Sequence, residues 1–410
     1  MLLRARVVLP LSQPPIEDGF VRVVKNRVTT VGAWADAPDE PVIDLGEVIL
    51  LPGLVNAHCH LDYTDFVGAI PPPKSFTDWI DAIVDLKAEV DDAAHADSWR
   101  HGADQCLRYG TTTLGNIESR PDQLPHLWLA TPLRVVSFFE LILFKPESNP
   151  AQAVEDADSW LTANLPPQGR AGLSPHAPYT TNADLLEACG RKTRPLAIHL
   201  AESADEHEMF CHGRGRMFER VASAGRVNSD CGFNSPIAHA AAHSVLRAST
   251  LAIHANYLSE TDVKQLAKSQ ASVVHCPRSH EYFRHEPFNE ADLSKAGVNL
   301  CLGTDSLATT CDREAELSLF DEMRLHAVSF PSLRAETILR RTTLNAAAAL
   351  GMGGEVGGIN EGAFADLITI PFAGNVAGAV EAVVRHEGPV QAVMVDGQWE
   401  VPPPSLAARE

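Results

Sequence analysis

The chain lacks three features that would assign it to common classes of protein. Its eight cysteines include no Cys-x-x-Cys pair, so neither a zinc knuckle nor a disulfide framework is indicated. It has no run of about 18 apolar residues that could span a bilayer, and its first apolar stretch stops at Pro10, too soon for a signal peptide. Basic residues are few: 33 Lys and Arg stand against 53 Asp and Glu, a net charge of -20, which argues against a nucleic-acid-binding surface. We expect a cytoplasmic protein that binds neither nucleic acid nor membrane.

The length and composition fit a soluble globular chain with one large domain and a smaller one, since 45% of the 410 residues are hydrophobic and 21% are charged. Both ends of the chain alternate short β-rich segments with turns. These segments are residues 5–9, 19–24, 28–31 and 42–45 at the start, and 366–370, 380–384 and 390–395 at the end. We predict that residues 1–51 and 356–410 pair into one composite β-sandwich.

The middle of the chain, residues 52–355, alternates strand-like runs with longer helical stretches, a pattern typical of βα units and a parallel sheet. Eight such runs occur, at residues 53–57, 111–115, 134–139, 170–174, 196–198, 250–253, 271–274 and 298–302. Eight repeats predict an α/β fold, a (β/α)8 TIM barrel, whose active site lies at the C-terminal ends of the strands.

Two histidines stand one residue apart at the end of the first of these runs, in Leu51-Pro-Gly-Leu-Val-Asn-Ala-His-Cys-His60. On an extended backbone, residues i and i+2 point to the same side, so His58 and His60 can reach one metal ion together. Cys59, between them, points the opposite way and is expected to pack in the core.

Other strand-like runs also end in polar residues, at His199, His254, His275 and Asp305. Three imidazoles and a carboxylate suit one divalent cation, zinc or ferrous iron, with a position left for water. Such a metal lowers the pKa of bound water to about 7, so the remaining tasks are proton transfers. Glu202, three residues after His199, can shuttle a proton, Asp305 can accept one from the water, and His254 can orient it.

Each of these residues has a simpler interpretation. Glu202 could cap or solvate a helix in the charged segment Glu202-Ser-Ala-Asp-Glu-His-Glu208, and Asp305 could be a helix cap in an ordinary turn. The remaining histidines are expected to be surface or core residues, among them His95, His101, His126, His239 and His243.

The motifs occur in an order that closely resembles the amidohydrolase superfamily, specifically the aminohydrolase branch with S-adenosylhomocysteine and methylthioadenosine deaminases, aminodeoxyfutalosine deaminases and triazine hydrolases. The resemblance covers essentially the whole chain. It includes Pro52-Gly-Leu-Val-Asn-Ala-His-Cys-His60, Ser174-Pro-His-Ala-Pro-Tyr-Thr180, His199-Leu-Ala-Glu202, His254, His275-Cys-Pro-Arg-Ser279, Gly303-Thr-Asp-Ser-Leu307 and Gly362-Ala-Phe-Ala-Asp-Leu367.

The resemblance implies roles for particular residues. His58, His60, His199 and Asp305 match the metal ligands, with zinc favoured over iron, while Glu202 and His254 match the catalytic pair. A single metal ion is implied, because the fourth strand, Arg170-Ala-Gly-Leu-Ser-Pro-His176, has no lysine that could be carboxylated to bridge two metal ions. His176 matches a histidine near the substrate, and Trp79 matches a pocket residue, with core packing as its alternative.

The chain departs from the pattern of the adenosyl deaminases at one position. Those deaminases carry a motif similar to Ser-Phe-Glu-Glu-Trp at the place where this chain has Ser75-Phe-Thr-Asp-Trp79. The first glutamate of that motif engages the ribose hydroxyls. Thr77 stands there instead, so ribose recognition is not implied. The motifs at residues 275–279 and 303–307 look closer to the aminodeoxyfutalosine deaminases than to the triazine hydrolases.

The expected function is therefore hydrolytic deamination of an amino-substituted purine-like ring. Glu202 would protonate a ring nitrogen, and Asp305 would relay a proton to the departing ammonia. The alternatives are hydrolysis of a chlorotriazine or a cyclic amide, or a barrel that keeps its fold as a non-catalytic scaffold. Because relatives are commonly dimers or larger, a homo-oligomer is also implied.

Overall fold

Eight parallel strands lie at the centre of the larger unit, and each pairs with the next one in chain order. The computed structural model describes residues 1–407. A parallel bridge joins Cys59, in the first strand, to Asp305, just after the last strand, so the barrel is nearly closed. The strands are β6 (Leu54–Cys59), β7 (Thr111–Glu118), β8 (Arg134–Leu141), β9 (Arg170–Pro175), β10 (Leu196–Leu200), β11 (Thr250–His254), β12 (Ser272–His275) and β13 (Leu300–Leu302).

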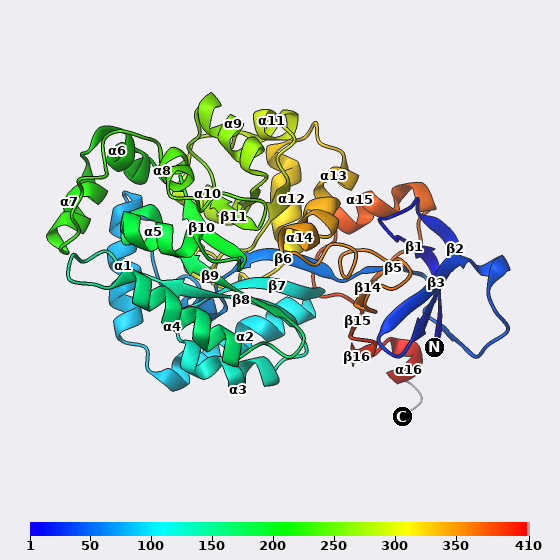
Figure 1. Cartoon of the computed structure of the whole chain (residues 1–410). Coiled ribbons are helices and arrows are strands. Elements are labelled where there is room, and N and C mark those ends of the chain that lie inside the picture. Colours follow the sequence, from blue (N-terminus) through cyan, green and yellow to red (C-terminus); the bar gives the residue numbers. More distant parts are fainter. Residues whose placement is uncertain (408–410) are drawn as a thin grey trace.

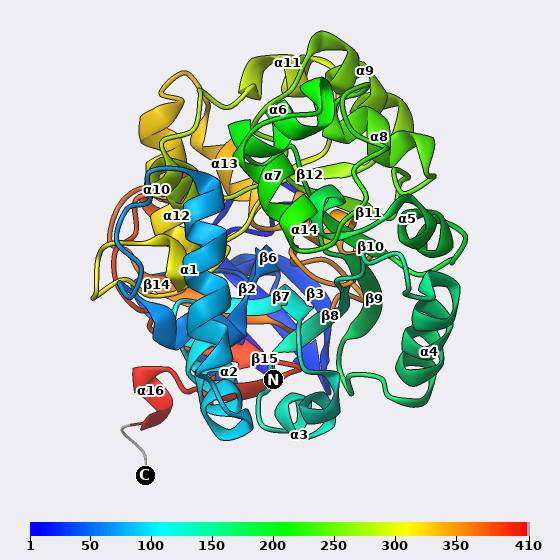
Figure 2. The ribbon, with the colours of Figure 1, turned by 90° about the vertical axis from the view of Figure 1, so that its left-hand side faces the viewer.

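Helices surround these strands, as seen from the barrel end that lies farther from the small sheet (Figure 2). Every residue of β6, β7, β10, β11, β12 and β13 is buried, as expected for parallel strands covered on both faces. The predicted (β/α)8 barrel is confirmed. Its helices are α1 (Phe76–Ala88), α2 (Asp92–Arg108), α3 (Leu124–Leu129), α4 (Pro150–Ala163), α5 (Ala183–Gly190), α6 (Ala204–His212), α7 (Arg216–Ser223), α8 (Pro236–Ala242), α9 (Glu260–Ser269), α10 (Pro277–Phe283), α11 (Glu290–Lys295), α12 (Leu319–Ser329), α13 (Ala335–Arg341) and α14 (Leu344–Ala349).

The two ends of the chain form one mixed sheet beside the barrel (Figure 1). The C-terminal strand β14 pairs antiparallel with the N-terminal β5, with Leu367 opposite Pro52. Buried side chains from both ends make a separate apolar cluster that includes Leu3, Val21 and Met394. The predicted pairing of the two chain ends in a separate β domain is confirmed, and its strands form one mixed sheet. Its strands are β1 (Leu2–Val8), β2 (Ile16–Val24), β3 (Arg27–Ala33), β4 (Val42–Asp44), β5 (Val48–Pro52), β14 (Leu367–Pro371), β15 (Ala392–Val395) and β16 (Gln398–Val401).

One predicted strand is wrong. Residues 380–384 lie in the helix α15 (Ala379–Val384). Its buried residues, Ala379, Val383 and Val384, recur at a spacing of four and one, which places them on one face of a helix. That face joins the core cluster that contains Ile338 of α13 and Phe320 of α12, so packing determined the structure of a segment whose β-branched residues favour a strand.

The remaining short helices are α16 (Pro404–Ala407) and the 3-10 helices η1 (Trp34–Asp36), η2 (Leu61–Phe66), η3 (Pro121–Gln123), η4 (Pro178–Thr180), η5 (Leu307–Thr309) and η6 (Val376–Gly378). The domain boundaries at 51/52 and 355/356 stay a prediction.

No helix within residues 1–407 combines the length and the apolar character needed to cross a membrane. All eight cysteines are free thiols.

A buried ion pair links the barrel to the small sheet. Arg134, at the start of β8, places Nε 2.6 Å from Oδ2 of Asp366, and both side chains are 2% exposed. The Nη2 atom of Arg134 lies 2.5 Å from Oδ1 of Asp396, a residue in the turn after β15. The two units are therefore joined by charge as well as by apolar packing.

Replacement of Arg134 by methionine is expected to lower the free energy of unfolding by about 3–5 kcal/mol, because it leaves the Asp366 carboxylate buried without its partner. The control is Arg385→Ala, which removes an exposed pair with Glu381 one helical turn away and is expected to cost less than about 0.5 kcal/mol. Urea unfolding followed by circular dichroism measures both. Equal effects of the two variants would show that the Arg134 pair does not stabilise the fold.

Candidate metal and active site

Five side chains that the sequence singled out meet at the C-terminal mouth of the barrel. Their metal-binding atoms form two overlapping groups, in each of which all atoms lie within 4.8 Å of one another. The first group is His58, His199 and His254, and the second is His58, His60 and Asp305. The four predicted metal ligands therefore lie together, and His254 stands beside them.

The distances inside this cluster are those of groups that face a common point. Nε2 of His60 lies 3.3 Å from Nε2 of His199, and Nε2 of His58 lies 3.4 Å from Oδ1 of Asp305. Nε2 of His58 is buried and has no hydrogen-bond partner among the described residues. A buried polar atom without a partner requires explanation, and a bound cation supplies one.

The tautomer of His199 also fits a metal ligand. Its Nδ1 lies 2.9 Å from the carbonyl oxygen of His176, and because a carbonyl only accepts, Nδ1 carries the proton. The lone pair is then on Nε2, the atom that faces His60. Histidines that bind metals usually donate their other ring N–H to such a carbonyl or a carboxylate.

The charge states in this cluster suit a divalent cation. Burial, with His58 nearby, lowers the pKa of His60 well below its ordinary value, and burial, with His176 nearby, does the same for His199. Both imidazoles are therefore neutral and keep lone pairs for a metal. Burial alone would raise the pKa of Asp305, but the neighbouring imidazoles, His58 at 3.4 Å first and then His254, outweigh it, so the pKa of this carboxyl lies well below its usual range.

Backbone conformation turns two of these residues into the barrel mouth. His254 has a φ of 70° and Asp305 a φ of 54°, both in the left-handed region that non-glycine residues seldom adopt. Each stands at or just after the end of its strand, where the left-handed conformation turns the chain away from the strand direction. Strained conformations of this kind concentrate at functional sites.

Glu202 lies against this cluster and not on a solvated helix. Its side chain is buried, with Oε1 3.4 Å from Nε2 of His254. The helix α6 is capped by Ser203, whose hydroxyl accepts the hydrogen bond from the Glu206 N–H, so Glu202 does not act as the cap. Burial first, and then the charge of Asp305, raises the pKa of Glu202 well above its ordinary value, which favours the protonated carboxyl.

Sequence reasoning overlooked Glu206, which it grouped with the charged residues of this segment. Glu206 is fully buried, and its Oε2 accepts a hydrogen bond of 2.8 Å from the backbone N–H of Glu202. The pattern Ser203-x-x-Glu206 was the available signal, since a serine three residues before a glutamate is typical of a helix N-terminus. Glu206 therefore holds the backbone from which Glu202 projects.

A cavity of about 300 Å³ opens onto the cluster. His176 and Trp79, the two predicted substrate contacts, both line it. Trp79 also packs on Phe76 with ring centroids 5.9 Å apart and donates from its indole nitrogen to the carbonyl of Ala308, so it belongs to the wall and to the core at once. Apolar side chains form much of the remaining wall. The polar lining residues to which sequence reasoning assigned no role include Tyr63, Lys87 and Glu140.

Thr77 and Arg278 do not line this cavity. The Thr77 hydroxyl donates to Oδ2 of Asp205 at 2.6 Å, which uses its only proton. The Arg278 guanidinium pairs with Glu322, with Nε 2.5 Å from Oε1.

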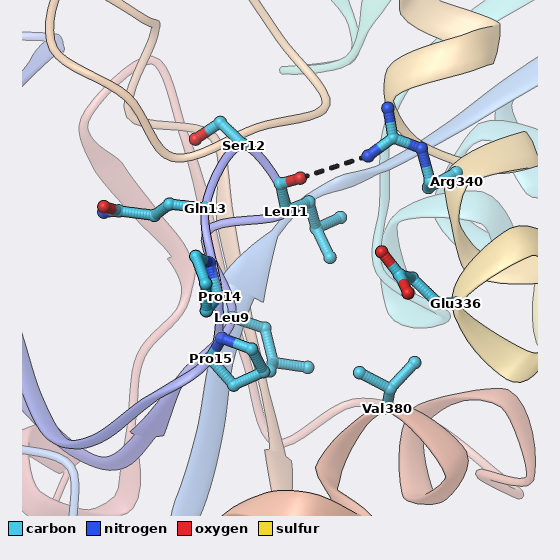
Figure 3. A pocket seen from close by; sticks show the side chains of 9 residues that line it. All are labelled: Leu9, Leu11, Ser12, Gln13, Pro14, Pro15, Glu336, Arg340 and Val380. Carbon is cyan, nitrogen blue, oxygen red and sulfur yellow. Dashed lines mark hydrogen bonds between the residues drawn. The ribbon is translucent and has the colours of Figure 1, made fainter.

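A second hollow, of about 480 Å³, lies between the loop after β1 and the helices α13 and α15 (Figure 3). Its charged side chains are Glu336 and Arg340, and Arg340 donates to the carbonyl oxygen of Leu11 at 3.3 Å. Both metal-binding groups among residues 1–407 lie at the barrel mouth, so this hollow has no comparable cluster.

The histidines expected to be surface or core residues are placed accordingly. His126 and His101 are exposed, whereas His95 and His239 are buried. Burial lowers the pKa of His239 to about 4, although Asp230 opposes this shift. An unfolded chain would bind a proton at this residue near its ordinary pKa of about 6.5.

The His239→Phe variant is expected to lose less stability in acid than the unchanged protein. Between pH 6.5 and about 4 the unfolded state binds a proton at His239 that the folded state does not, so the free energy of unfolding falls as the pH falls. The unchanged protein should lose about 2 kcal/mol more than the variant between pH 7 and pH 5, as measured by urea unfolding. The exposed control, His126→Phe, should behave as the unchanged protein does; a His239→Phe variant that loses as much would contradict the assignment.

Residues 49–399 match the model of the amidohydrolase family. A 5-methylthioadenosine/S-adenosylhomocysteine deaminase of Syntrophobacter fumaroxidans is 29% identical over 382 residues, which covers 87% of this chain and 80% of the relative. A Helicobacter pylori aminofutalosine deaminase has a TM-score of 0.84 at 20% identity, covering 97% of this chain and 99% of the other. A Xanthomonas campestris adenosine deaminase with bound zinc has a TM-score of 0.82 at 24% identity, covering 98% of this chain and 93% of the other.

The chain belongs to the amidohydrolase family, since the match covers most of its length. Family membership confirms the resemblance seen in the motifs, and the deaminase relatives confirm the predicted enzyme class, a hydrolase acting on carbon–nitrogen bonds. The His and Asp cluster, together with a family neighbour that holds zinc, supports a divalent metal.

Proposed function

We propose that the protein is a zinc-dependent aminohydrolase that converts an amino-substituted purine-like ring to the oxo form and releases ammonia. The observation that carries the proposal is the position of Glu202, a buried carboxyl with a raised pKa, in the same cavity as the His and Asp cluster. A protonated acid beside a metal-binding cluster is the arrangement that hydrolysis of a ring carbon–nitrogen bond requires.

The proposed metal ligands are His58, His60, His199 and Asp305. When bound, a divalent cation supplies an acidic water molecule and favours negative charge that develops near it. Zinc is preferred to iron because three imidazoles and a carboxylate suit zinc and because a structure of the same fold holds it.

The proton transfers are assigned to three residues. Glu202 gives its proton to the ring nitrogen beside the carbon under attack, which makes that carbon more electrophilic. It regains a proton from the new hydroxyl group when the amine leaves and the ring takes the oxo form. The carboxylate of Asp305 accepts a proton from the attacking water and passes it to the departing amine. Nε2 of His254, 3.4 Å from Glu202 and within the cluster, orients the water between them.

The substrate is proposed from the relatives and from the cavity. Relatives act, by their names, on 5-methylthioadenosine and S-adenosylhomocysteine, and on aminofutalosine. An adenosine-type compound or aminodeoxyfutalosine is therefore the first choice. A planar ring fits between the apolar wall that includes Phe76 and Trp79 and the polar side that includes His176. A homo-oligomer and a cytoplasmic location stay predictions.

The test is ammonia release by the purified, zinc-loaded protein from adenine, adenosine, 5′-methylthioadenosine, S-adenosylhomocysteine and aminodeoxyfutalosine, with atrazine and a cyclic amide in parallel. Ammonia from at least one aminopurine compound is the expected result. If the protein released chloride from atrazine or opened the ring of the cyclic amide, and released no ammonia from any aminopurine, the proposed deamination would be wrong and the rival hydrolysis would take its place. A protein that purifies without stoichiometric metal and has no activity in any assay would point to a scaffold.

A further inference from the structure

Glu140 is a buried acid in the catalytic cavity to which the proposed reaction gives no role. It stands next to the end of β8, its side chain is only 8% exposed, and it lines the same cavity as the His and Asp cluster. Its side chain has no hydrogen bond to a described residue, and Nε2 of His176, 3.9 Å from Oε1, is beyond hydrogen-bond distance. A carboxylate buried in this way normally accepts hydrogen bonds. No described residue donates one to Glu140, so we expect the donor to come from a ligand.

The atom that faces Glu140 is also an acceptor. Nδ1 of His176 lies 2.7 Å from the Thr180 hydroxyl, and that hydroxyl donates its one proton to the carbonyl oxygen of Ala177. Thr180 must therefore accept from Nδ1, which leaves the lone pair of His176 on Nε2. Two acceptors, the Glu140 carboxylate and Nε2 of His176, thus face the cavity side by side and cannot satisfy one another.

Charge at this position favours a neutral donor over a cation. The ammonium of Lys87 lies in the same cavity and donates to the Tyr63 hydroxyl at 2.5 Å. It forms no ion pair with Glu140 among the described residues, but its charge opposes the effect of burial, which raises the pKa of Glu140. A cationic ligand group would be repelled by Lys87, whereas hydroxyl groups would not.

We infer that Glu140, together with Nε2 of His176, forms the subsite that binds two adjacent hydroxyl groups of the substrate. The inference rests on the proposed function and narrows it: the substrate is a nucleoside or another ring that carries a vicinal diol, and not a free base. Two adjacent hydroxyls offer one proton to each acceptor, whereas the single N–H of a free base satisfies only one. Thr77 takes no part, because Asp205 occupies its hydroxyl.

The test compares adenosine with 2′,3′-dideoxyadenosine, which keeps the purine ring and lacks both hydroxyls. The zinc-loaded protein should show a kcat/KM at least about 100-fold higher for adenosine, since a site built to bind hydroxyls rejects an analogue without them. Glu140→Gln should reduce this preference to about 10-fold or less, mainly by raising KM for adenosine. The rate with dideoxyadenosine should stay within about threefold, which also shows that the variant folds.

The matched control is Glu147→Gln, the same substitution at an exposed residue beyond the end of β8, which should keep the full preference. Calorimetric titration of both nucleosides into Glu202→Gln protein measures the same preference without turnover. Deamination of both nucleosides at similar rates, or a preference that survives Glu140→Gln, would overturn the subsite and leave the deaminase proposal in place. Absence of ammonia release from every aminopurine, together with equal binding of the two nucleosides, would overturn both.

Discussion

Glu202→Gln protein is expected to bind its metal normally and to lose about 10²- to 10⁴-fold in turnover, the range that a positioned acid contributes. Glutamine matches glutamate in shape, so it can keep the place of the side chain next to His254. It cannot give a proton to the ring nitrogen at that point. The loss should therefore lie in kcat, with the metal content unchanged.

Two measurements separate this loss from damage to the fold. Metal content by mass spectrometry and the urea midpoint should match those of the unchanged protein. The control is Glu260→Gln, since Glu260 is highly exposed on α9 and the same substitution there should leave kcat unaffected. Full turnover by Glu202→Gln protein would remove Glu202 from the proposed reaction.

His60→Asn protein is expected to lose the metal itself. Nε2 of His60 lies 3.3 Å from Nε2 of His199 and 3.8 Å from Oδ1 of Asp305, so removal of this imidazole takes one donor from the centre of the cluster. Loss of partners that merely support metal ligands weakens metal binding about 10- to 100-fold, and loss of a ligand should cost at least the upper value. Turnover at stoichiometric zinc should then fall below detection.

A zinc titration followed by metal analysis and a fluorescent chelator measures the affinity directly. Partial recovery of turnover in excess zinc is expected for His60→Asn, because the other three donors remain. His126→Asn is the control, because His126 is exposed and far from the cluster in the sequence. Stoichiometric, tightly held metal in His60→Asn protein would exclude His60 as a ligand.

The small errors and omissions of the sequence reasoning share a cause. The segment 380–384 has β-branched residues and was taken for a strand, but contacts with α12 and α13 hold it as a helix. Glu206 was grouped with solvated charges, although the turn of α6 brings its carboxylate back to the backbone of Glu202. In both places a contact with a distant or folded-back element outweighed the local preference.

The sequence by itself predicted the barrel, the pairing of the two chain ends and the residues that meet at the barrel mouth. The barrel and the meeting of these residues follow from short-range rules. Alternate residues of a strand share a side, so His58 and His60 had to point together, and parallel strands place their C-terminal ends at one mouth. Only the tertiary structure decided what surrounds that cluster. Lys87 comes from α1 and Glu140 from β8, and no spacing along the chain predicts that barrel closure sets them in one cavity beside His176.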